Sequence, residues 1–265
     1  MNNPFKEWSR DFRLLAAAVF AVGAFFGVQL GLYNNFVVSR LAIEPQELGY
    51  VEALREVPGF LQAIFIALMV RLAPSVISGF ALGIMGIGIA AYASVSSIPT
   101  LALYSVIWSI GFHLWAPLEQ VMALSYSPPG EKGRWLGQLR SVGSIAMLAS
   151  IGASLVLMDY VGYAGLFALA GAAVVLGGGG LLFASRKTSG EAEKGILIKR
   201  EYFLYYVLNF LEGCRKQMFI TFAIFALVKV HGVPVKTTLI LFFANQFLIT
   251  LTAPVLGRMV DRFGE

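Results

Sequence analysis

The sequence predicts an all-helical membrane protein, a bundle of hydrophobic helices that crosses a lipid bilayer many times. Of its 265 residues, 58% are hydrophobic and only 13% are charged, and the mean hydropathy is +0.75. A soluble domain usually carries about 25% charged residues. The hydrophobic residues form runs long enough to span a bilayer, which takes about 20 residues, and no alternating pattern suggests strands.

Eight of these runs can each form a membrane-spanning helix. Their connections are short, apart from one polar and charged stretch. We interpret residues 1–185 as an N-terminal six-helix half, 186–200 as a cytoplasmic linker, and 201–265 as the first two helices of a second half. The eight runs cover about residues 14–38, 48–70, 75–95, 99–123, 137–158, 162–185, 202–228 and 237–257.

Basic residues indicate the orientation, because Lys and Arg concentrate in the cytoplasmic loops of membrane proteins. With the N-terminus inside, fourteen basic residues fall in inside segments and three fall outside. We therefore expect both termini and the linker to be cytoplasmic, in a bacterial cytoplasmic membrane. The inside residues are Lys6, Arg10, Arg13, Arg71, Lys132, Arg134, Arg140, Arg186, Lys187, Lys194, Lys199, Arg200, Arg258 and Arg262, and the outside residues are Arg40, Lys229 and Lys236.

Several function classes lack their sequence signals. The basic residues cluster in short loops without interleaved aromatic residues, so the net charge of +5 does not indicate nucleic-acid binding. The single cysteine, Cys214, rules out an intramolecular disulfide framework. No nucleophile motif, zinc-protease motif or phosphate-binding glycine loop occurs. We therefore expect no enzyme activity, no metal and no cofactor.

The seventh run carries charges near its middle, where the bilayer midplane is expected. Glu212 precedes Arg215 and Lys216 by three and four residues, so all three can share one helix face. Charges at this depth cost roughly 2.5–3.5 kcal/mol each and usually face a protein interior or a water-filled cavity. We predict that these side chains bind solute, with Arg215 best placed to meet an anionic group. The alternative is a structural lock with Asn245 and Gln246 on the eighth run.

The polar residues of the first run are Gln29, Asn34 and Asn35. Polar side chains within a membrane helix commonly form hydrogen bonds to neighbouring helices. That interpretation is favoured here, and the alternative is that they line a solute path opposite the seventh run. We include all three among the candidate solute-binding residues.

The second run opens with Glu52, Arg55 and Glu56, again at helical spacing, followed by Pro58 and Gly59, which can bend or loosen the helix. One interpretation is a structural ion pair that neutralises itself. The other is an extracellular gate or a protonatable carboxylate, because two acids beside one arginine leave one acid incompletely compensated.

The fourth run contains His113, Glu119 and Gln120. His113 and Gln120 share a helix face, whereas Glu119 points elsewhere and is a further candidate for gating or coupling. A lone histidine is more commonly a hydrogen-bonded interior residue than a proton carrier. No second His or Cys lies at the spacing of metal ligands, so a metal site is not expected.

Glycines at helical spacing predict close contacts between helices. Gly23, Gly27 and Gly31 lie on one face of the first run. The third run is nearly free of charge and also rich in glycine, so packing is its expected role. Its glycines are Gly79, Gly83, Gly86 and Gly88.

The last residues, Gly257 to Glu265, read G-R-M-V-D-R-F-G-E. This segment resembles the loop motif G-x-x-x-D-R-x-G-R of the major facilitator superfamily, at the place where that family repeats it. The carried-over residues are Gly257, Asp261 and Arg262. Glu265 replaces the closing basic residue, and the corresponding loop at 70–75 has no Asp-Arg pair.

The resemblance implies two six-helix halves with a solute site between them near the midplane. On that basis the chain corresponds to the first eight of twelve helices, a C-terminally truncated copy. The implied function is secondary active transport of a small polar or charged solute by alternating access, coupled to an ion or a proton. A truncated, non-transporting membrane subunit or receptor is the alternative.

The expected partners are a small-molecule solute and the lipid bilayer, with no nucleic acid. Polar groups that face lipid are costly, so the missing C-terminal helices or another copy of the chain are expected to be needed for stability. In the resembling family the motif with Asp261 and Arg262 connects neighbouring cytoplasmic helix ends and biases the conformational cycle.

Overall fold

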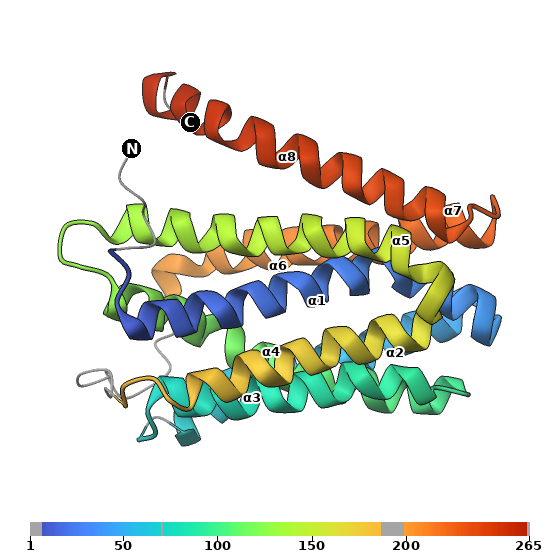
Figure 1. Cartoon of the computed structure of the whole chain (residues 1–265), viewed down its shortest axis with the longest axis horizontal. Helices are drawn as coiled ribbons and strands as arrows, with labels where there is room; N and C mark the ends of the chain where they lie inside the picture. Colours follow the sequence, from blue (N-terminus) through green and yellow to red (C-terminus); the bar gives the residue numbers. More distant parts are fainter. Residues whose placement is uncertain (1–6, 70, 187–198, 264–265) are drawn as a thin grey trace.

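The computed structural model describes residues 7–69, 71–186 and 199–263, with side chains undescribed at 209, 216, 217, 220 and 253–263. Within these ranges the chain is helical and contains no strand, which confirms the predicted fold class (Figure 1). The elements are α1 Arg10–Leu41, α2 Pro45–Met69, α3 Pro74–Ala90, η2 Ala91–Ser94, α4 Ile98–Tyr126, α5 Lys132–Leu181, η3 Arg200–Tyr202, α6 Phe203–Met218, the π-helical η4 Phe219–Ala223, α7 Ile224–Lys229 and α8 Val235–Phe263.

Two of the predicted runs lie within α5, because the chain reverses direction inside that element. Gly162 has a φ of 61° and a ψ of −168°, a conformation that glycine adopts without the steric cost of a side chain. Figure 1 shows the chain turning back at this point, so that the two arms of α5 run in opposite directions. The seventh predicted run is likewise divided among α6, η4 and α7.

Within the residues that the structure describes, five helical segments are long and hydrophobic enough to cross a membrane. α2 is not among them, because its helix carries the Glu52, Arg55 and Glu56 cluster. The two arms of α5 are counted as one segment. The seventh run is divided into shorter helices, because α6 ends where η4 begins. The prediction of eight crossings therefore remains a prediction for the other segments. The five segments are Arg10–Leu41, Pro74–Ser94, Ile98–Tyr126, Lys132–Leu181 and Val235–Thr252.

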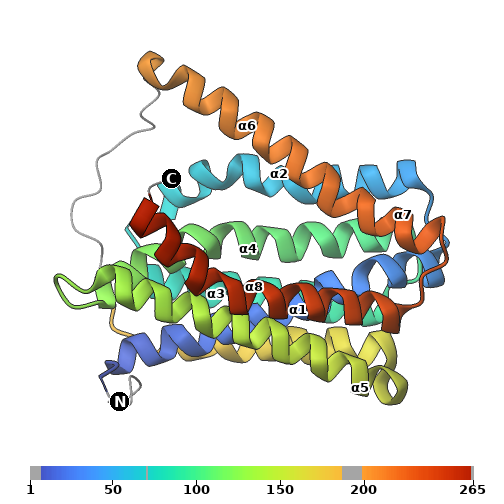
Figure 2. The same ribbon diagram turned by 90° about the horizontal axis from the view of Figure 1, so that it is seen from above.

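The helices run nearly parallel to one long axis. The direction alternates from α1 through α4, between the two arms of α5, and from the continuous α6–η4–α7 run to α8 (Figure 1). Both chain ends lie at the same end of the bundle, together with the end of α5 and the start of α6 (Figures 1 and 2). This is the arrangement that an even number of crossings produces.

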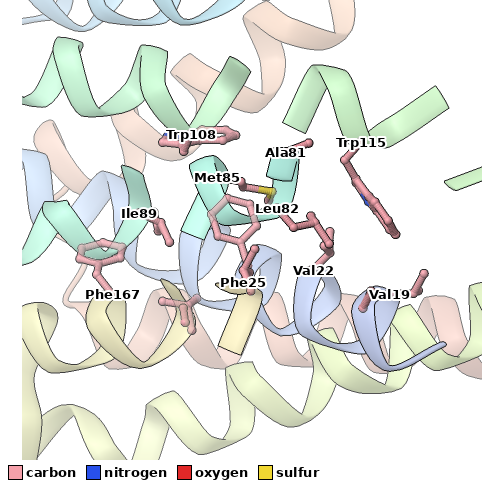
Figure 3. Packing of buried hydrophobic residues seen from close by; sticks show 14 of the residues in the cluster. Val19, Val22, Phe25, Ala81, Leu82, Met85, Ile89, Trp108, Trp115 and Phe167 are labelled. Carbon is pink, nitrogen blue, oxygen red and sulfur yellow. The ribbon is translucent and has the colours of Figure 1, made fainter. Parts of the chain in front are cut away.

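Helix α1 lies at the centre of the bundle. It packs most extensively on α5 and also contacts α4, α7 and α8. Figure 3 shows Phe25 of α1 among Met85 of α3, Trp108 of α4 and Phe167 of α5. All four side chains are nearly or fully buried. Because these are large apolar groups drawn from four helices, their packing fixes the positions of α1, α3, α4 and α5 relative to one another.

The glycine face of α1 makes the close contacts that its spacing predicts. A Cβ atom at Gly27 would lie 2.5 Å from the backbone oxygen of Met147 on α5, and one at Gly31 would lie 2.7 Å from the side chain of Leu239 on α8. The backbone oxygen at Gly27 leaves no room for a methyl group, whereas at Gly31 the Leu239 side chain would have to shift. α1 therefore lies close to both α5 and α8, as its glycine spacing predicts.

Helix α6 diverges from α2 toward the end of the bundle that holds the chain termini, as Figure 2 shows. Its more extensive contacts are with the adjoining η3 and η4. Large hydrophobic side chains along it are exposed, among them Tyr205, Phe210 and Leu211. Such a surface suits lipid or further protein, and the expected need for additional helices or another copy remains a prediction.

Candidate functional site

Three adjoining cavities separate α1, α2 and α4 from α6, η4, α7 and α8. The α2–α6 cavity has a volume of about 830 Å³ and lies between α2, α4 and α6. The central cavity, about 370 Å³, is enclosed by α1, α2 and α4 with Thr221 of η4. The α1–α8 cavity, about 450 Å³, lies between α1, η4, α7 and α8. Glu52, Glu56 and Thr221 line the first two cavities, and Asn34 lines the last two.

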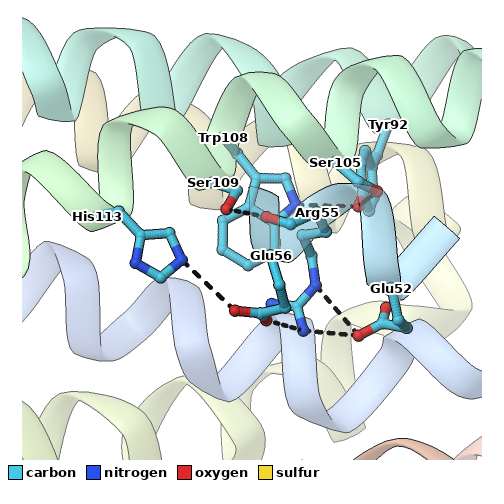
Figure 4. Close-up of polar contacts among 8 residues, drawn as sticks. All are labelled: Glu52, Arg55, Glu56, Tyr92, Ser105, Trp108, Ser109 and His113. Atoms are coloured by element: carbon cyan, nitrogen blue, oxygen red, sulfur yellow. Dashed lines mark hydrogen bonds and ion pairs between the residues drawn. The ribbon is translucent and has the colours of Figure 1, made fainter. Parts of the chain in front are cut away.

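The charged cluster of α2 lies at the wall shared by the first two cavities. Nη2 of Arg55 is 2.6 Å from Oε2 of Glu52 and 2.7 Å from Oε1 of Glu56, and Nε of Arg55 also donates to Glu52 at 3.1 Å (Figure 4). One turn of helix brings the three side chains to one face, as their spacing predicts. One guanidinium therefore bridges two carboxylates beside a cavity.

A fourth member, His113 of α4, joins this cluster from a separate helix. Its Nε2 lies 3.6 Å from Oε2 of Glu56 (Figure 4). The approach depends on Gly59, where a Cβ atom would lie 2.8 Å from the His113 ring. From the sequence, His113 was favoured as an interior residue rather than as part of a site. Its pairing with Glu56 arises from helix packing, and no spacing within α4 could have shown it.

Aromatic and hydroxyl groups hold Arg55 in place. Its guanidinium lies over the Trp108 ring, 5.3 Å from the centroid. Nε1 of Trp108 donates to the hydroxyl of Tyr92 at 3.0 Å, and that hydroxyl is 2.6 Å from Oγ of Ser105. These residues come from α4 and η2, so a network outside α2 determines the position of the arginine.

The α2 backbone is also supported where its hydrogen-bond ladder is interrupted. Pro58 lies inside the helix and has no N–H to donate to the preceding turn. In that turn the hydroxyl of Ser109 donates to the carbonyl oxygen of Arg55 (Figure 4). α4 therefore contributes a backbone contact as well as a ring contact to the turn of α2 that precedes Pro58.

Two polar residues of α1 face the same cluster across the central cavity. Gln29 and Asn34 both line it, and their side chains are only 7% and 8% exposed. Oε1 of Gln29 and Oδ1 of Asn34 have no hydrogen-bond partner among the residues that the structure describes. A buried acceptor without a partner costs about 1–3 kcal/mol. The structure thus places unsatisfied acceptors opposite a charged cluster.

Comparison with known families decides the classification. The family model of the Major Facilitator Superfamily matches residues 14–265. The chain belongs to the major facilitator superfamily. No curated protein matches the sequence. Among solved structures, the chain is similar to the crystal structure of the nucleoside transporter NupG, with a TM-score of 0.75 and 13% sequence identity. That similarity covers 97% of this chain and 69% of the other chain.

The superfamily assignment and the shared fold support a secondary transporter of a small solute, as the loop motif implied. The three cavities lie between α1, α2 and α4 on one side and the segment 203–252 on the other. The family resemblance implies a solute site between these two parts of the chain. The predicted residues Gln29, Asn34, Glu52, Arg55 and Glu56 meet in the central cavity.

Asn35 lines none of the three cavities, unlike its neighbour Asn34. Its Nδ2 donates to the backbone oxygen of Val233, in the α7–α8 loop, at 2.9 Å. This bond is the interhelical type of contact that was favoured for the polar residues of the first run. Asn35 thus connects α1 to the last two helices.

The charged residues of α6 are less directly connected to the cavities. Glu212 and Arg215 are exposed, and neither is among the residues that line the three cavities. Between them in sequence, Gly213 and Cys214 do line the α2–α6 cavity. The side chain of Lys216 lies outside the described residues.

The alternative structural lock between the seventh and eighth runs is not formed by the side chains that the structure describes. No hydrogen bond or ion pair there joins Glu212 or Arg215 to Asn245 or Gln246. Asn245 instead lines the α1–α8 cavity, and Gln246 is buried.

The remaining candidates lie away from the cluster or outside the described side chains. Glu119 is partly buried on α4, interacts electrostatically with Arg140 of α5, and lines none of the three cavities. Gly257, Asp261 and Arg262 belong to α8, but their side chains are not described. The proposed role of the loop motif therefore remains a prediction.

A set of contacts, here called the clamp, closes the bundle at the end opposite the chain termini. Nζ of Lys229 donates to the backbone oxygens of Ala42 and Ile43, at 3.4 and 3.1 Å, and to Oε1 of Glu44 at 2.9 Å. Asn35 and Val233 form the second contact of the clamp. The third is an exposed ion pair of 2.6 Å between Lys236 and Asp159.

Proposed function

We propose that the protein is a secondary active transporter that moves a small polar or charged solute by alternating access, coupled to an ion or a proton. The observation that carries this proposal is the central cavity, where the unpartnered acceptors of Gln29 and Asn34 face the Glu52, Arg55 and Glu56 cluster. A cavity that serves an apolar solute needs no such groups. Buried polar groups without partners gain most from a solute that supplies hydrogen bonds.

Alternating access requires two sets of helices that close at one end of the membrane and open at the other. The clamp supports closure at the end opposite the termini. At the end that holds the termini, α6 and α8 diverge from the other helices (Figures 1 and 2), whereas the contacts of the clamp lie at the opposite end. With the orientation that the basic residues predict, this is an inward-facing state with an extracellular clamp.

The clamp leads to a prediction about accessibility. Lys229→Met removes the cation that satisfies the carbonyl oxygens at the end of α1, so the extracellular end should open more often. The measurement is alkylation of a Thr238→Cys residue by an impermeant maleimide added outside, in a Cys214→Ala background. Thr238 is buried beside the α1–α8 cavity. We expect alkylation to accelerate severalfold when Lys229 is replaced.

Lys236→Met is the matched control for this experiment. Lys236 forms a single exposed ion pair with Asp159, and pairs of this kind contribute little. Its removal should leave the alkylation rate nearly unchanged. Equal rates in both variants would show that Lys229 does not hold this end closed.

Uptake by membrane vesicles containing the protein tests the proposed function. The solutes are anionic, zwitterionic, cationic and neutral polar compounds, with nucleosides included because the similar solved structure is a nucleoside transporter. We expect concentrative uptake of at least one polar class. Asn34→Leu should reduce it, because Asn34 lines two of the cavities, whereas Gln138→Leu, near the start of α5, should not. Binding without uptake would favour the receptor alternative.

A further inference from the structure

We propose that the solute taken by the central cavity is an organic cation with N–H donors, held by Glu56 together with the side-chain oxygens of Gln29 and Asn34. This inference rests on the proposed transport function and specifies its substrate class. It follows from three independent features of the cavity, which are its charge balance, its unpartnered acceptors and its aromatic walls.

Among the residues that the structure describes, the charged groups that line the cavities do not balance. Two carboxylates, Glu52 and Glu56, face one guanidinium, Arg55. Glu52 accepts two hydrogen bonds from Arg55 and is only 12% exposed, whereas Glu56 accepts one close contact and is 33% exposed. The uncompensated negative charge therefore lies mainly at Glu56, which lines both the α2–α6 and the central cavity.

The neighbour of Glu56 makes this carboxylate available for a second cation. His113 lies 3.6 Å away and neutralises Glu56 only when the imidazole is protonated. With a neutral imidazole, a cation from solution can pair with the Glu56 carboxylate.

The buried polar atoms of the central cavity without a partner among the described residues can all accept a hydrogen bond, including the Tyr33 hydroxyl, which can also donate. Gln29 and Asn34 are both more than nine-tenths buried and line the cavity, and their Oε1 and Oδ1 atoms have no hydrogen-bond partner among the described residues. Together with the Glu56 carboxylate they form an acceptor set that matches an ammonium, amidinium or guanidinium group. An anionic group would leave these oxygens unpaired and would meet a negative charge.

The apolar part of the central cavity is aromatic. Phe26, Tyr33 and Phe112 line it with Trp108, and the rings of Phe26 and Phe112 pack edge to face at 5.3 Å. Aromatic ring faces attract cations. Arg55 already occupies the face of Trp108, which shows that this environment accommodates a cation.

The bases of α6 provide the competing expectation. Arg215 and Lys216 follow Cys214 directly in the sequence. If they controlled the potential in the cavity, it would favour anions. Cys214 is the single cysteine of the chain and lines the α2–α6 cavity beside Glu52 and Glu56, so its reactivity reports the local potential.

The experiment compares two methanethiosulfonate reagents of similar size on the otherwise native protein, one carrying trimethylammonium and the other sulfonate. Their rate ratio at Cys214 is divided by the ratio for β-mercaptoethanol in solution. A fixed negative charge accelerates the reaction of the cationic reagent and slows that of the anionic one. We therefore expect the normalised rate ratio to favour the cationic reagent by about tenfold. Glu56→Gln should bring the ratio close to the solution value.

Glu131→Gln is the control, because Glu131 is an exposed acid at the start of α5. It should not change the ratio. A ratio at or below the solution value, or one that Glu56→Gln leaves unchanged, would overturn the inference. If Glu56→Gln fails to accumulate, the same pair of reagents is applied to Thr221→Cys in a Cys214→Ala background, since Thr221 lines both cavities. A cation preference without any uptake would count against transport but not against the charge of the cavity.

Discussion

Gly86→Ala should destabilise the bundle by about 1–3 kcal/mol, the usual range for added volume in a packed interior. A Cβ atom at Gly86 would lie 2.5 Å from the backbone oxygen of Gly171 and 2.9 Å from the backbone nitrogen of Val175, both on α5. Backbone atoms cannot move aside as a flexible side chain can, so α3 and α5 must separate. The measurement is reversible unfolding of the purified protein in mixed detergent micelles.

Gly83→Ala, one turn earlier on α3, is the matched control. A Cβ atom at Gly83 would have no neighbour within 4 Å. Both substitutions bring the same gain in helix propensity, roughly 0.5–1 kcal/mol, so their difference isolates the packing cost. Gly83→Ala should be neutral or stabilising. If both variants unfold alike, the close approach of α3 to α5 is not what holds these helices together.

Arg55→Gln should cost about 3 kcal/mol and reduce the amount of protein in the membrane. The substitution leaves Glu52 and Glu56 without the cation that lies 2.6 and 2.7 Å from them. Removing one partner of a buried ion pair typically costs 3–5 kcal/mol, and the lower part of that range applies because Glu56 is 33% exposed. The measurements are membrane yield and the midpoint of unfolding in the same micelles.

Arg134→Gln provides the surface comparison. Arg134 also bridges two carboxylates, Glu7 at 2.8 Å and Glu131 at 2.9 Å, but its side chain is 49% exposed. Its removal should change the midpoint little, because solvent replaces the lost contacts. The double variant Arg55→Gln/Glu52→Gln should recover part of the loss, since it removes one charge of each sign. No recovery would indicate that packing of Arg55 on Trp108 is its main contribution.

Local patterns in the sequence were sufficient to predict several parts of the site. Glu52, Arg55 and Glu56 share a face because helix geometry alone places residues three and four apart together. The glycines of α1 face close neighbours because a glycine stripe has few other uses in a membrane helix. The loop motif at Asp261 led to the superfamily, which the family comparison confirms.

Relations between helices could not be predicted from spacing. His113 pairs with Glu56 because Gly59 admits its ring, and the two residues lie on different helices. Lys229 of α7 caps the end of α1, although 186 positions separate it from Ile43. Such contacts depend on which helix faces pack together, and one sequence contains no local signal for that choice.

The sequence by itself determined the fold class, because long hydrophobic runs in a bilayer satisfy their backbone hydrogen bonds as helices. It also determined the residues available for a polar site. Only the tertiary structure decided how they combine. The packing of α1 and α2 on α4 places Gln29 and Asn34 opposite Glu52, Arg55 and Glu56, whereas Glu212 and Arg215 of α6 are left exposed. The physical reason is that a side chain's position on its helix is a local property, whereas the cavity it faces depends on every helix around it.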